Sequence, residues 1–370
     1  MNREFVNSAR STAQCIFAAL LLVVAFNWVF FSEFVYQRVL LNDSGSGLVR
    51  HMLHAEKTRH HPVGFKTAIV FGDSRLGEGF SAKAANEFAE ADRLEIVNAA
   101  IPSTTLRCWA YFVKRLDPDA NRYDYVVLAL PSLSTEATDV LADRLLDLDY
   151  LAPLVGLNEV FNVAATFSDF EVKMQALRDL MLKGFIFKYD VQDFLSRPLF
   201  RIRAAFQTQA DGWYSYFYPG RQESLEGVTW DEARLEPVFS DGVDGRVKEA
   251  IQTYERNRKL PSLAVNSDYN KKWLNLILDH YKNSKTRVVV LQMPRGPLPT
   301  TSENVQPLPE IQEVARSHDH FDVVAPNRFR DFENPQDFFD YLHMNAAGRR
   351  RFSRALTDEI LKIHRRSKEN

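Results

Sequence analysis

The chain has 370 residues, of which 45% are hydrophobic and 25% are charged. This balance is typical of globular proteins and is sufficient for one large domain or two small ones. The 46 basic and 48 acidic residues give a formal net charge of −2. Such a chain lacks the strong positive field that a phosphate backbone requires, so we predict no nucleic-acid partner. Two cysteines, Cys15 and Cys108, are too few for a disulfide framework or a thiolate metal site.

The N-terminal region contains one long apolar segment. Residues 11–31 carry no charge, and a helix of this length spans about 30 Å, the hydrocarbon thickness of a bilayer. Trp28 and Tyr36 lie toward its far end, where amphipathic rings prefer the membrane interface. We therefore predict a transmembrane anchor over residues 11–36. The alternatives are a cleaved signal peptide, which would be shorter and end in small residues, and a buried core helix.

The charges that flank this segment predict its orientation. Arg3 and Arg10 precede it, whereas Glu33 follows it. The positive-inside rule then places residues 1–10 in the cytoplasm and exports the chain after residue 36. We expect a single-pass membrane protein whose main domain is periplasmic or extracytoplasmic.

Residues 37–65 are largely polar and rich in histidine, and they predict a solvated stalk. Four histidines invite a metal site, but no carboxylate or cysteine is spaced to complete one. We therefore predict no metal and no cofactor. The four residues are His51, His54, His60 and His61.

Beyond residue 65, short apolar runs alternate with segments of helical composition. Such alternation predicts an α/β fold, with a parallel sheet covered by helices on both faces. The run 123–130 is apolar enough to be buried on both sides. The predicted strands are 66–71, 94–98, 123–130, 287–293 and 321–325, and the predicted helices are 81–91, 104–116 and 346–363.

A long stretch, residues 136–285, separates the third and fourth predicted strands. It is mostly helical in composition up to residue 206 and more irregular over 207–262. We interpret it as an insertion within a domain over 66–370 that packs on the rim of the sheet and roofs the ligand crevice. Its aromatic side chains could stack on sugar rings, or they could pack in a core. They are Trp213, Tyr214, Tyr216, Phe217, Tyr218 and Trp230.

Two short motifs carry candidate chemistry. Gly72-Asp73-Ser74 ends the first strand, at the edge where open α/β sheets form their ligand crevice. Ser74 can project its hydroxyl there, and its N–H near a helix N-terminus is an oxyanion donor. The alternative is a helix cap made by Asp73.

The second motif is Asp340-Tyr341-Leu342-His343. An Asp three residues before a His can place both side chains on one side of a turn. The carboxylate then orients the imidazole and leaves its other nitrogen for a serine. The alternative is a surface loop with a capping Asp. Among the nine histidines, only His343 combines this spacing with a loop beyond the last predicted strand.

Together these motifs resemble the blocks of the SGNH (GDSL-like) hydrolase superfamily, over about residues 66–135 and 286–363. The resemblance implies a three-layer flavodoxin-like fold, with an N-terminal transmembrane helix and a large helical insertion added here. It also implies catalytic roles for Ser74 as nucleophile, His343 as base and Asp340 as its orienting partner.

The sequence departs from the family at both oxyanion blocks. Ser103 replaces the usual Gly of the second block. The third block of the family carries an Asn donor, whereas this chain has no Asn there and has Ser132. Loss of one donor can cost about 2.7–4 kcal/mol of transition-state stabilisation. Either Ser132 or Ser134 substitutes for the missing Asn, or the enzyme is slower and more selective than the generalist esterases of the family. We predict that Ser74, Ser103 and Ser132 contribute to the oxyanion site. Arg75 could bind an anionic substrate, or it could pair with Asp73 or Glu78.

An anchor, an exported SGNH domain and a missing third-block Asn resemble one branch more closely. It includes the D-alanyl transfer protein of teichoic acid synthesis and the alginate O-acetylation proteins, which work beside a membrane-bound O-acyltransferase. This resemblance implies a serine acyltransferase or esterase acting on a cell-envelope polysaccharide, with such a membrane partner. The alternatives are a hydrolytic esterase or deacetylase, and a non-catalytic membrane-tethered scaffold subunit.

Overall fold

The computed structural model describes most of the chain as two compact units. The helical unit combines residues 1–54 with 143–212, and the sheet unit combines 55–142 with 213–370. The described residues are 3–41, 44–131, 145–167, 169–211, 218–231, 233–234, 236–259, 267–298 and 307–369.

The sheet unit is built on five parallel strands, as predicted from the alternating pattern. Their order across the sheet is β2-β1-β3-β6-β7, and every neighbouring pair is parallel. The strand order reverses between β1 and β3, and in open α/β sheets ligands bind beyond the carboxyl ends of the strands at such a reversal. The strands are β1 (Lys66–Phe71), β2 (Leu94–Asn98), β3 (Tyr125–Leu130), β6 (Arg287–Gln292) and β7 (Phe321–Val323).

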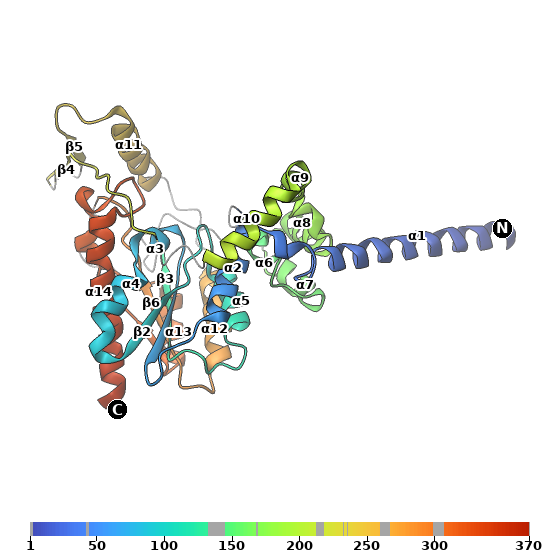
Figure 1. The fold of residues 1–370 in the computed structure, drawn as a ribbon, viewed down its shortest axis with the longest axis horizontal. Helices are drawn as coiled ribbons and strands as arrows, with labels where there is room; N and C mark the ends of the chain where they lie inside the picture. The colour runs from blue at the N-terminus through green and yellow to red at the C-terminus, as the bar shows by residue number, and fades with distance from the viewer. Residues whose placement is uncertain are drawn as a thin grey trace. The chain divides into compact units, whose positions relative to one another are not determined.

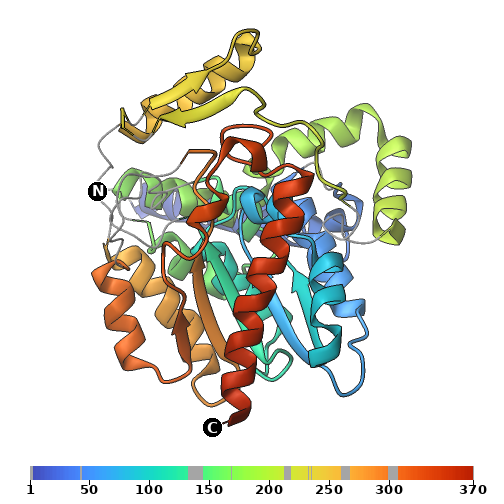
Figure 2. The same ribbon diagram turned by 90° about the vertical axis from the view of Figure 1, so that its left-hand side faces the viewer.

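Helices cover both faces of this sheet. Alternate residues of β1 point to opposite faces. On one face, Val70 belongs to the apolar cluster that includes Leu356 of α14 (Ala346–Glu369). The ring of Phe71 instead lies 6.4 Å from that of Phe112. Figure 2 shows α14 crossing one face of the sheet. The other helices of these layers are α3 (Ser74–Gly79), α4 (Ala82–Ala89), α5 (Leu106–Leu116), α12 (Ser267–Tyr281) and α13 (Pro309–Ser317).

The stretch predicted as irregular contains regular structure. A hairpin pairs β4 (Val228–Asp231) with β5 (Glu236–Phe239) in a sheet of its own, and α11 (Gly245–Lys259) follows. Trp230 packs partly buried against the main apolar cluster. That contact supports the packing interpretation for this ring. The aromatic residues at 213, 214, 216 and 217 lie outside the described residues.

The helical unit begins with α1 (Arg3–Phe30), drawn in blue in Figure 1. Within the described part of the chain, Arg10–Phe30 is the one stretch long and apolar enough to cross a membrane. The remaining elements are the 3-10 turn η1 (Tyr36–Val39), α2 (Gly45–Thr58), α6 (Asp147–Leu151), η3 (Leu157–Glu159), α7 (Val160–Ala164), α8 (Phe170–Met181), η4 (Lys183–Phe185), α9 (Lys188–Ser196) and α10 (Pro198–Asp211).

The predicted anchor boundary at residue 36 is wrong. The helix ends at Phe30, and Tyr36 is buried at 3% exposure rather than placed at a membrane interface. Phe31 and Tyr36 share an apolar cluster with Phe187, whose ring stacks on that of Phe31 at 5.1 Å. Burial of these rings inside the protein accounts for the difference, because their apolar surface is already removed from water.

The predicted stalk is also wrong over most of its length. Residues 45–58 form α2, in which Val49, Met52, Leu53 and Glu56 are buried. Their spacing of i, i+3, i+4 and i+7 is the face of an amphipathic helix. Because histidines lie between these residues in the sequence, composition alone indicates a polar segment and not an amphipathic helix.

The domain boundaries differ from those predicted. Residues 143–212 belong to the helical unit, whereas 213–285 belong to the sheet unit, so 66–370 is not one compact body. The reason is visible in the core of the helical unit. Phe187 and Ala152 of the predicted insertion fill one cluster with Leu40, which follows α1.

Candidate active site

The turn after β1 presents Ser74 as the first residue of α3. The Asp73 carboxylate caps this helix by accepting a hydrogen bond from the N–H of Arg75 at 2.9 Å. Gly72 makes the tight turn feasible, because a Cβ there would lie 2.6 Å from the Cβ of Leu76. The capping alternative for Asp73 is therefore confirmed, and the same cap orients the residue that follows it.

The loop before α14 holds Asp340 and His343 in one turn. One Asp340 oxygen accepts hydrogen bonds from the N–H groups of Leu342 and His343, at 2.7 and 2.6 Å. Its other oxygen lies 2.9 Å from His343 Nδ1. A backbone hydrogen bond from Phe339 N to the carbonyl of His343 closes the turn. The three-residue spacing thus produces the predicted pairing.

The structure brings both motifs together. His343 Nε2 lies 2.9 Å from Ser74 Oγ, although 269 positions separate the two residues in the chain. The side chains of His343 and Asp340 are 22% and 31% exposed, and Ser74 is half-buried. The hydroxyl, the imidazole and the carboxylate therefore form a continuous chain that a substrate can approach from solvent. This is the geometry of a nucleophile, a base and an orienting acid.

The electrostatics of Asp340 favour its ionised form. Burial by itself raises the pKa of this carboxyl, but the hydrogen bond and the positive charge of His343 oppose that effect, as do the two backbone N–H donors. The net pKa lies below the ordinary value of 3.8. An ionised carboxylate at this position fixes the His343 tautomer that leaves Nε2 free to accept the serine proton.

Ser103 adopts a left-handed backbone conformation. Its φ of +60° lies in the left-handed region, which L-residues other than Gly rarely occupy. Two hydrogen bonds tie its loop to the nucleophile turn, since Ile101 N–H and Thr104 Oγ1 both donate to the carbonyl of Gly72, at 3.0 and 3.2 Å. The loop that carries Ser103 is thus fixed against the turn that carries Ser74.

Two other predicted site residues have different outcomes. Arg75 is 6% exposed, and its Nε donates to Asp73 Oδ2 at 3.2 Å, which is one of the ion pairs considered from the sequence. Its contact with a substrate stays a prediction. Ser132 lies outside the described residues.

Two further side chains, which no sequence motif indicates, border the site. The Phe339 ring stacks on His343, with centroids 5.8 Å apart and planes 14° from parallel. The exposed guanidinium of Arg221 lies 4.7 Å from the centre of the Phe339 ring. Tyr218 from the same segment donates a hydrogen bond to Glu78 of α3. Residues 218–221, within the predicted insertion, therefore border the candidate site.

The basic run at 349–351 of α14 contains one buried arginine. Arg349 is 3% exposed and donates to the carbonyls of Gly77 and Glu78, each at 2.7 Å. It thereby satisfies backbone acceptors at the end of α3. The signal was available, because Arg349 shares the spacing of the buried Phe352 and Leu356 of α14.

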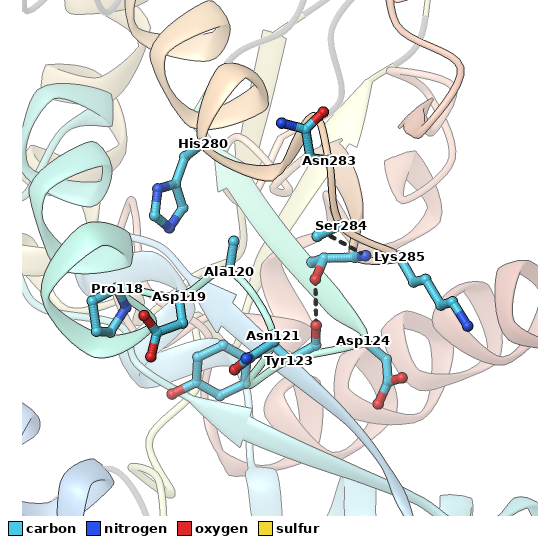
Figure 3. Close-up of a pocket in the computed structure, with 11 residues that line it drawn as sticks. Pro118, Asp119, Ala120, Asn121, Tyr123, Asp124, His280, Asn283, Ser284 and Lys285 are labelled. Carbon is cyan, nitrogen blue, oxygen red and sulfur yellow. Dashed lines mark hydrogen bonds between the residues drawn. The ribbon is translucent and has the colours of Figure 1, made fainter.

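A cavity of about 570 Å³ lies at the opposite edge of the sheet. Its lining comes from residues 118–124 and 283–286, which precede β3 and β6, together with His280 (Figure 3). His280 Nε2 lies 2.7 Å from the carbonyl oxygen of Asp117. The cavity is thus at the amino ends of the strands, away from Ser74.

No protein-family model and no curated protein matches the chain. The functional case therefore depends on the geometry of its own residues. Among the residues that the structure describes, no group of three His, Cys, Asp or Glu side chains is placed to hold a metal ion.

Proposed function

We propose that this protein is a membrane-anchored, extracytoplasmic SGNH-type serine acyltransferase or esterase that acts on acyl groups of a cell-envelope polysaccharide. The observation that carries the proposal is the chain from Ser74 Oγ to His343 Nε2 and from His343 Nδ1 to Asp340, with both links at 2.9 Å. The strand order, with β1 between β2 and β3, supports the flavodoxin-like SGNH fold.

In the first half-reaction, Ser74 Oγ attacks the carbonyl carbon of an acyl donor while His343 Nε2 takes the hydroxyl proton. The N–H groups of Ser74 and Ser103 stabilise the oxyanion, with Ser132 as the third predicted contributor. Collapse of the tetrahedral intermediate breaks the bond to the leaving group, which receives the proton from His343. The product is an ester between the acyl group and Ser74.

In the second half-reaction, a hydroxyl group attacks the carbonyl carbon of acyl-Ser74, and His343 takes its proton. The bond to Ser74 Oγ then breaks, and His343 returns the proton to that oxygen. Attack by a sugar hydroxyl is acyl transfer, whereas attack by water is hydrolysis. The triad serves both outcomes, so the hydrolytic esterase differs only in the acceptor that reaches the site.

The anchor supports the choice of a cell-envelope substrate. The stretch Arg10–Phe30 has the length and hydropathy of a span, and the flanking arginines favour a cytoplasmic N-terminus. An anchored transferase outside the cytoplasm needs activated acyl groups delivered across the bilayer. A membrane-bound O-acyltransferase is the partner that meets this need.

The test is to trap an acyl group on Ser74. The full chain in detergent is incubated with candidate acyl donors and, separately, with a fluorophosphonate, and the peptide that contains Ser74 is analysed by mass. We expect an adduct in the wild type and in Ser81→Ala, the matched variant of a nearby serine that caps α4. We expect no adduct in Ser74→Ala or His343→Ala, provided that both variants remain folded.

Absence of any adduct on Ser74 of the folded wild type would favour the scaffold alternative. Release of the free acid from a trapped adduct, with a polysaccharide acceptor present, would favour hydrolysis over transfer.

A further inference from the structure

The large apolar side chains that remain exposed are concentrated in the helical unit. Besides those of α1 and the pair Phe34 and Val35 that follows it, they lie between residues 146 and 206, mostly on short helices, whereas the described part of the sheet unit exposes few of them. Many exposed large apolar side chains within one unit are typical of an interaction surface. Within residues 146–206 they are Leu146, Leu157, Phe161, Phe170, Met174, Phe185, Tyr189, Leu195, Leu199, Phe200 and Phe206.

The polarity of α10 is inverted relative to a helix on a water-soluble surface. Leu199, Phe200 and Phe206 are 72%, 54% and 59% exposed. Arg201, on the same helix, is 1% exposed. Its guanidinium pairs with Asp190 at 2.5 Å and with Asp193 at 2.6 Å. Arg203 is also exposed, between Leu199 and Phe206. A surface helix in water normally buries its apolar stripe, whereas α10 exposes three large apolar side chains beside one arginine, a mixture suited to the boundary between water and an apolar medium.

Three exposed cations lie over aromatic rings on the same group of helices. Lys188 Nζ is 4.5 Å from the ring centre of Tyr189, and Arg197 lies 4.8 Å from that of Phe200. Arg178 likewise lies 4.7 Å from the ring centre of Phe185. Aromatic rings with neighbouring basic groups are enriched at membrane interfaces, where the ring meets acyl chains and the cation meets phosphate.

The C-terminal end of α1 contacts this group of helices. Trp28 Nε1 donates to the carbonyl of Met181 at 3.1 Å, and Lys183 Nζ lies 4.0 Å from the Trp28 ring centre. The N–H of Gly184 donates to Asn27 Oδ1 at 3.3 Å. Figure 1 shows α7, α8 and α9 gathered around this end of α1. If α1 crosses a bilayer, these contacts hold the short helices at the level where the span leaves it.

We propose that the exposed faces of α8, α9 and α10 lie in the interfacial layer of the bilayer that α1 crosses. Their apolar side chains enter the acyl-chain boundary, and Arg178, Lys188 and Arg197 contact anionic phosphate headgroups. This inference rests on the membrane anchoring in the proposed function and is independent of the chemistry at Ser74. The contacts between the end of α1 and this group of helices favour lipid over a protein partner, because they hold the helices beside the membrane-spanning segment.

The test measures which medium surrounds α10 in the full-length protein. Leu199→Cys and Phe206→Cys are made in a Cys15→Ser background, where Cys108 is fully buried and unreactive. Each variant is spin-labelled and reconstituted in vesicles of phosphatidylethanolamine and phosphatidylglycerol. Collisions with oxygen, which partitions into lipid, are compared with collisions with a water-soluble nickel chelate. Val63→Cys is the matched control, since Val63 is an apolar side chain 96% exposed in the sheet unit.

We expect the oxygen-to-nickel ratio at positions 199 and 206 to exceed that at 63 severalfold. A ratio equal to that at 63 would overturn the proposal, since the face would then lie in water. Shielding from both reagents would also overturn it and would indicate a protein occupant, such as a second copy. Each sample is first floated with its vesicles after an alkaline wash. Failure to float would show that α1 does not anchor the chain and would overturn this proposal. The chemistry at Ser74 is tested separately, by its acylation.

Discussion

The imidazole of His343 lies almost flat against the ring of Phe339, with planes 14° from parallel and centroids 5.8 Å apart. The hydrogen bonds to Asp340 and Ser74 hold the two nitrogens of the same imidazole. The ring is therefore restrained by a stack across its face and by bonds along its edge. In the proposed mechanism, such restraint would keep Nε2 directed at the serine hydroxyl through both half-reactions.

We expect Phe339→Ala to lower kcat for ester cleavage by about 10- to 100-fold, because a small misplacement of a catalytic group has effects of that order. The KM should change much less, since Phe339 acts through His343. Phe339→Tyr preserves the stack and should retain activity. The measurement is steady-state kinetics on both variants, with thermal unfolding as the control for folding. An unchanged kcat in a folded Phe339→Ala protein would show that the stack has no positioning role.

Replacement of Asp340 by Asn should lower kcat by about 10⁴-fold, since an amide favours the wrong imidazole tautomer.

The depressed pKa of Asp340 also predicts a pH effect on stability. The folded carboxyl has a lower pKa than the unfolded one, so its contribution is present above the ordinary value of 3.8 and is lost as the pH falls through the folded pKa. Asp340→Asn should remove this loss. Denaturant unfolding at pH 3 and pH 6 measures the loss of unfolding free energy in the wild type and in Asp340→Asn. An equal loss in both proteins would contradict the prediction.

Ser103 is held at a φ of +60°, which costs a residue with a Cβ about 1–2 kcal/mol relative to glycine. Ser103→Gly should therefore raise the free energy of unfolding by about 1 kcal/mol, less the entropy that glycine adds to the unfolded chain. Its activity should be retained, because the backbone N–H is unchanged. Ser103→Ala, which keeps the strain and lacks the hydroxyl, is the matched control. Lost activity in both variants would assign a role to the hydroxyl rather than to the amide.

Local patterns predicted the sheet and the two motifs because each depends on neighbouring residues. The β3 run is apolar throughout and is wholly buried, and Ser81 accepts from the N–H of Ala84 as an N-cap should. The pairing of Asp340 with His343 likewise depends on one turn. The meeting of His343 with Ser74 was predicted from strand order, since both follow strands of one parallel sheet.

The helical unit could not be predicted in the same way. Its core joins Phe31 and Tyr36, which follow α1, to Phe187 in a distant part of the chain. Neither segment has a complete apolar face by itself, so composition suggested an interfacial ring and a rim insertion. The burial of Arg349 was missed for a related reason, because its acceptors lie on α3.

The proposed topology predicts opposite behaviour for two reporters. Alkaline phosphatase fused after Asn370 should be active, because it folds only outside the cytoplasm, and a fluorescent protein that requires the cytoplasm should be dark there. Fusion of the same reporters before Arg3, at the other end of α1, should reverse both signals. Cytoplasmic signal from the fusion after Asn370 would contradict the anchor orientation and the cell-envelope role together.

The buried His51 leads us to predict a second pH dependence of stability, in the helical unit. Its side chain is 4% exposed, and neither ring nitrogen has a hydrogen-bond partner among the described residues. Burial, aided by the positive charges of Arg50 and His54, lowers the pKa of His51 from 6.5 to about 4. Between these values the unfolded chain binds more protons than the folded one, so stability rises with pH over this window and falls as the pH drops from 6.5 toward 4.

Acidification from pH 7 to pH 5 should therefore lower the free energy of unfolding of the wild type by on the order of 1 kcal/mol, through protonation of His51 in the unfolded chain. His51→Leu has no proton to gain and should show a smaller drop in unfolding midpoint over the same range. His60→Leu, which replaces an exposed histidine of the same region, is the matched control and should keep the wild-type drop. Thermal unfolding of the full chain in detergent at both pH values makes the comparison. If His51→Leu and His60→Leu lose the same stability on acidification, the buried imidazole is not the group that titrates.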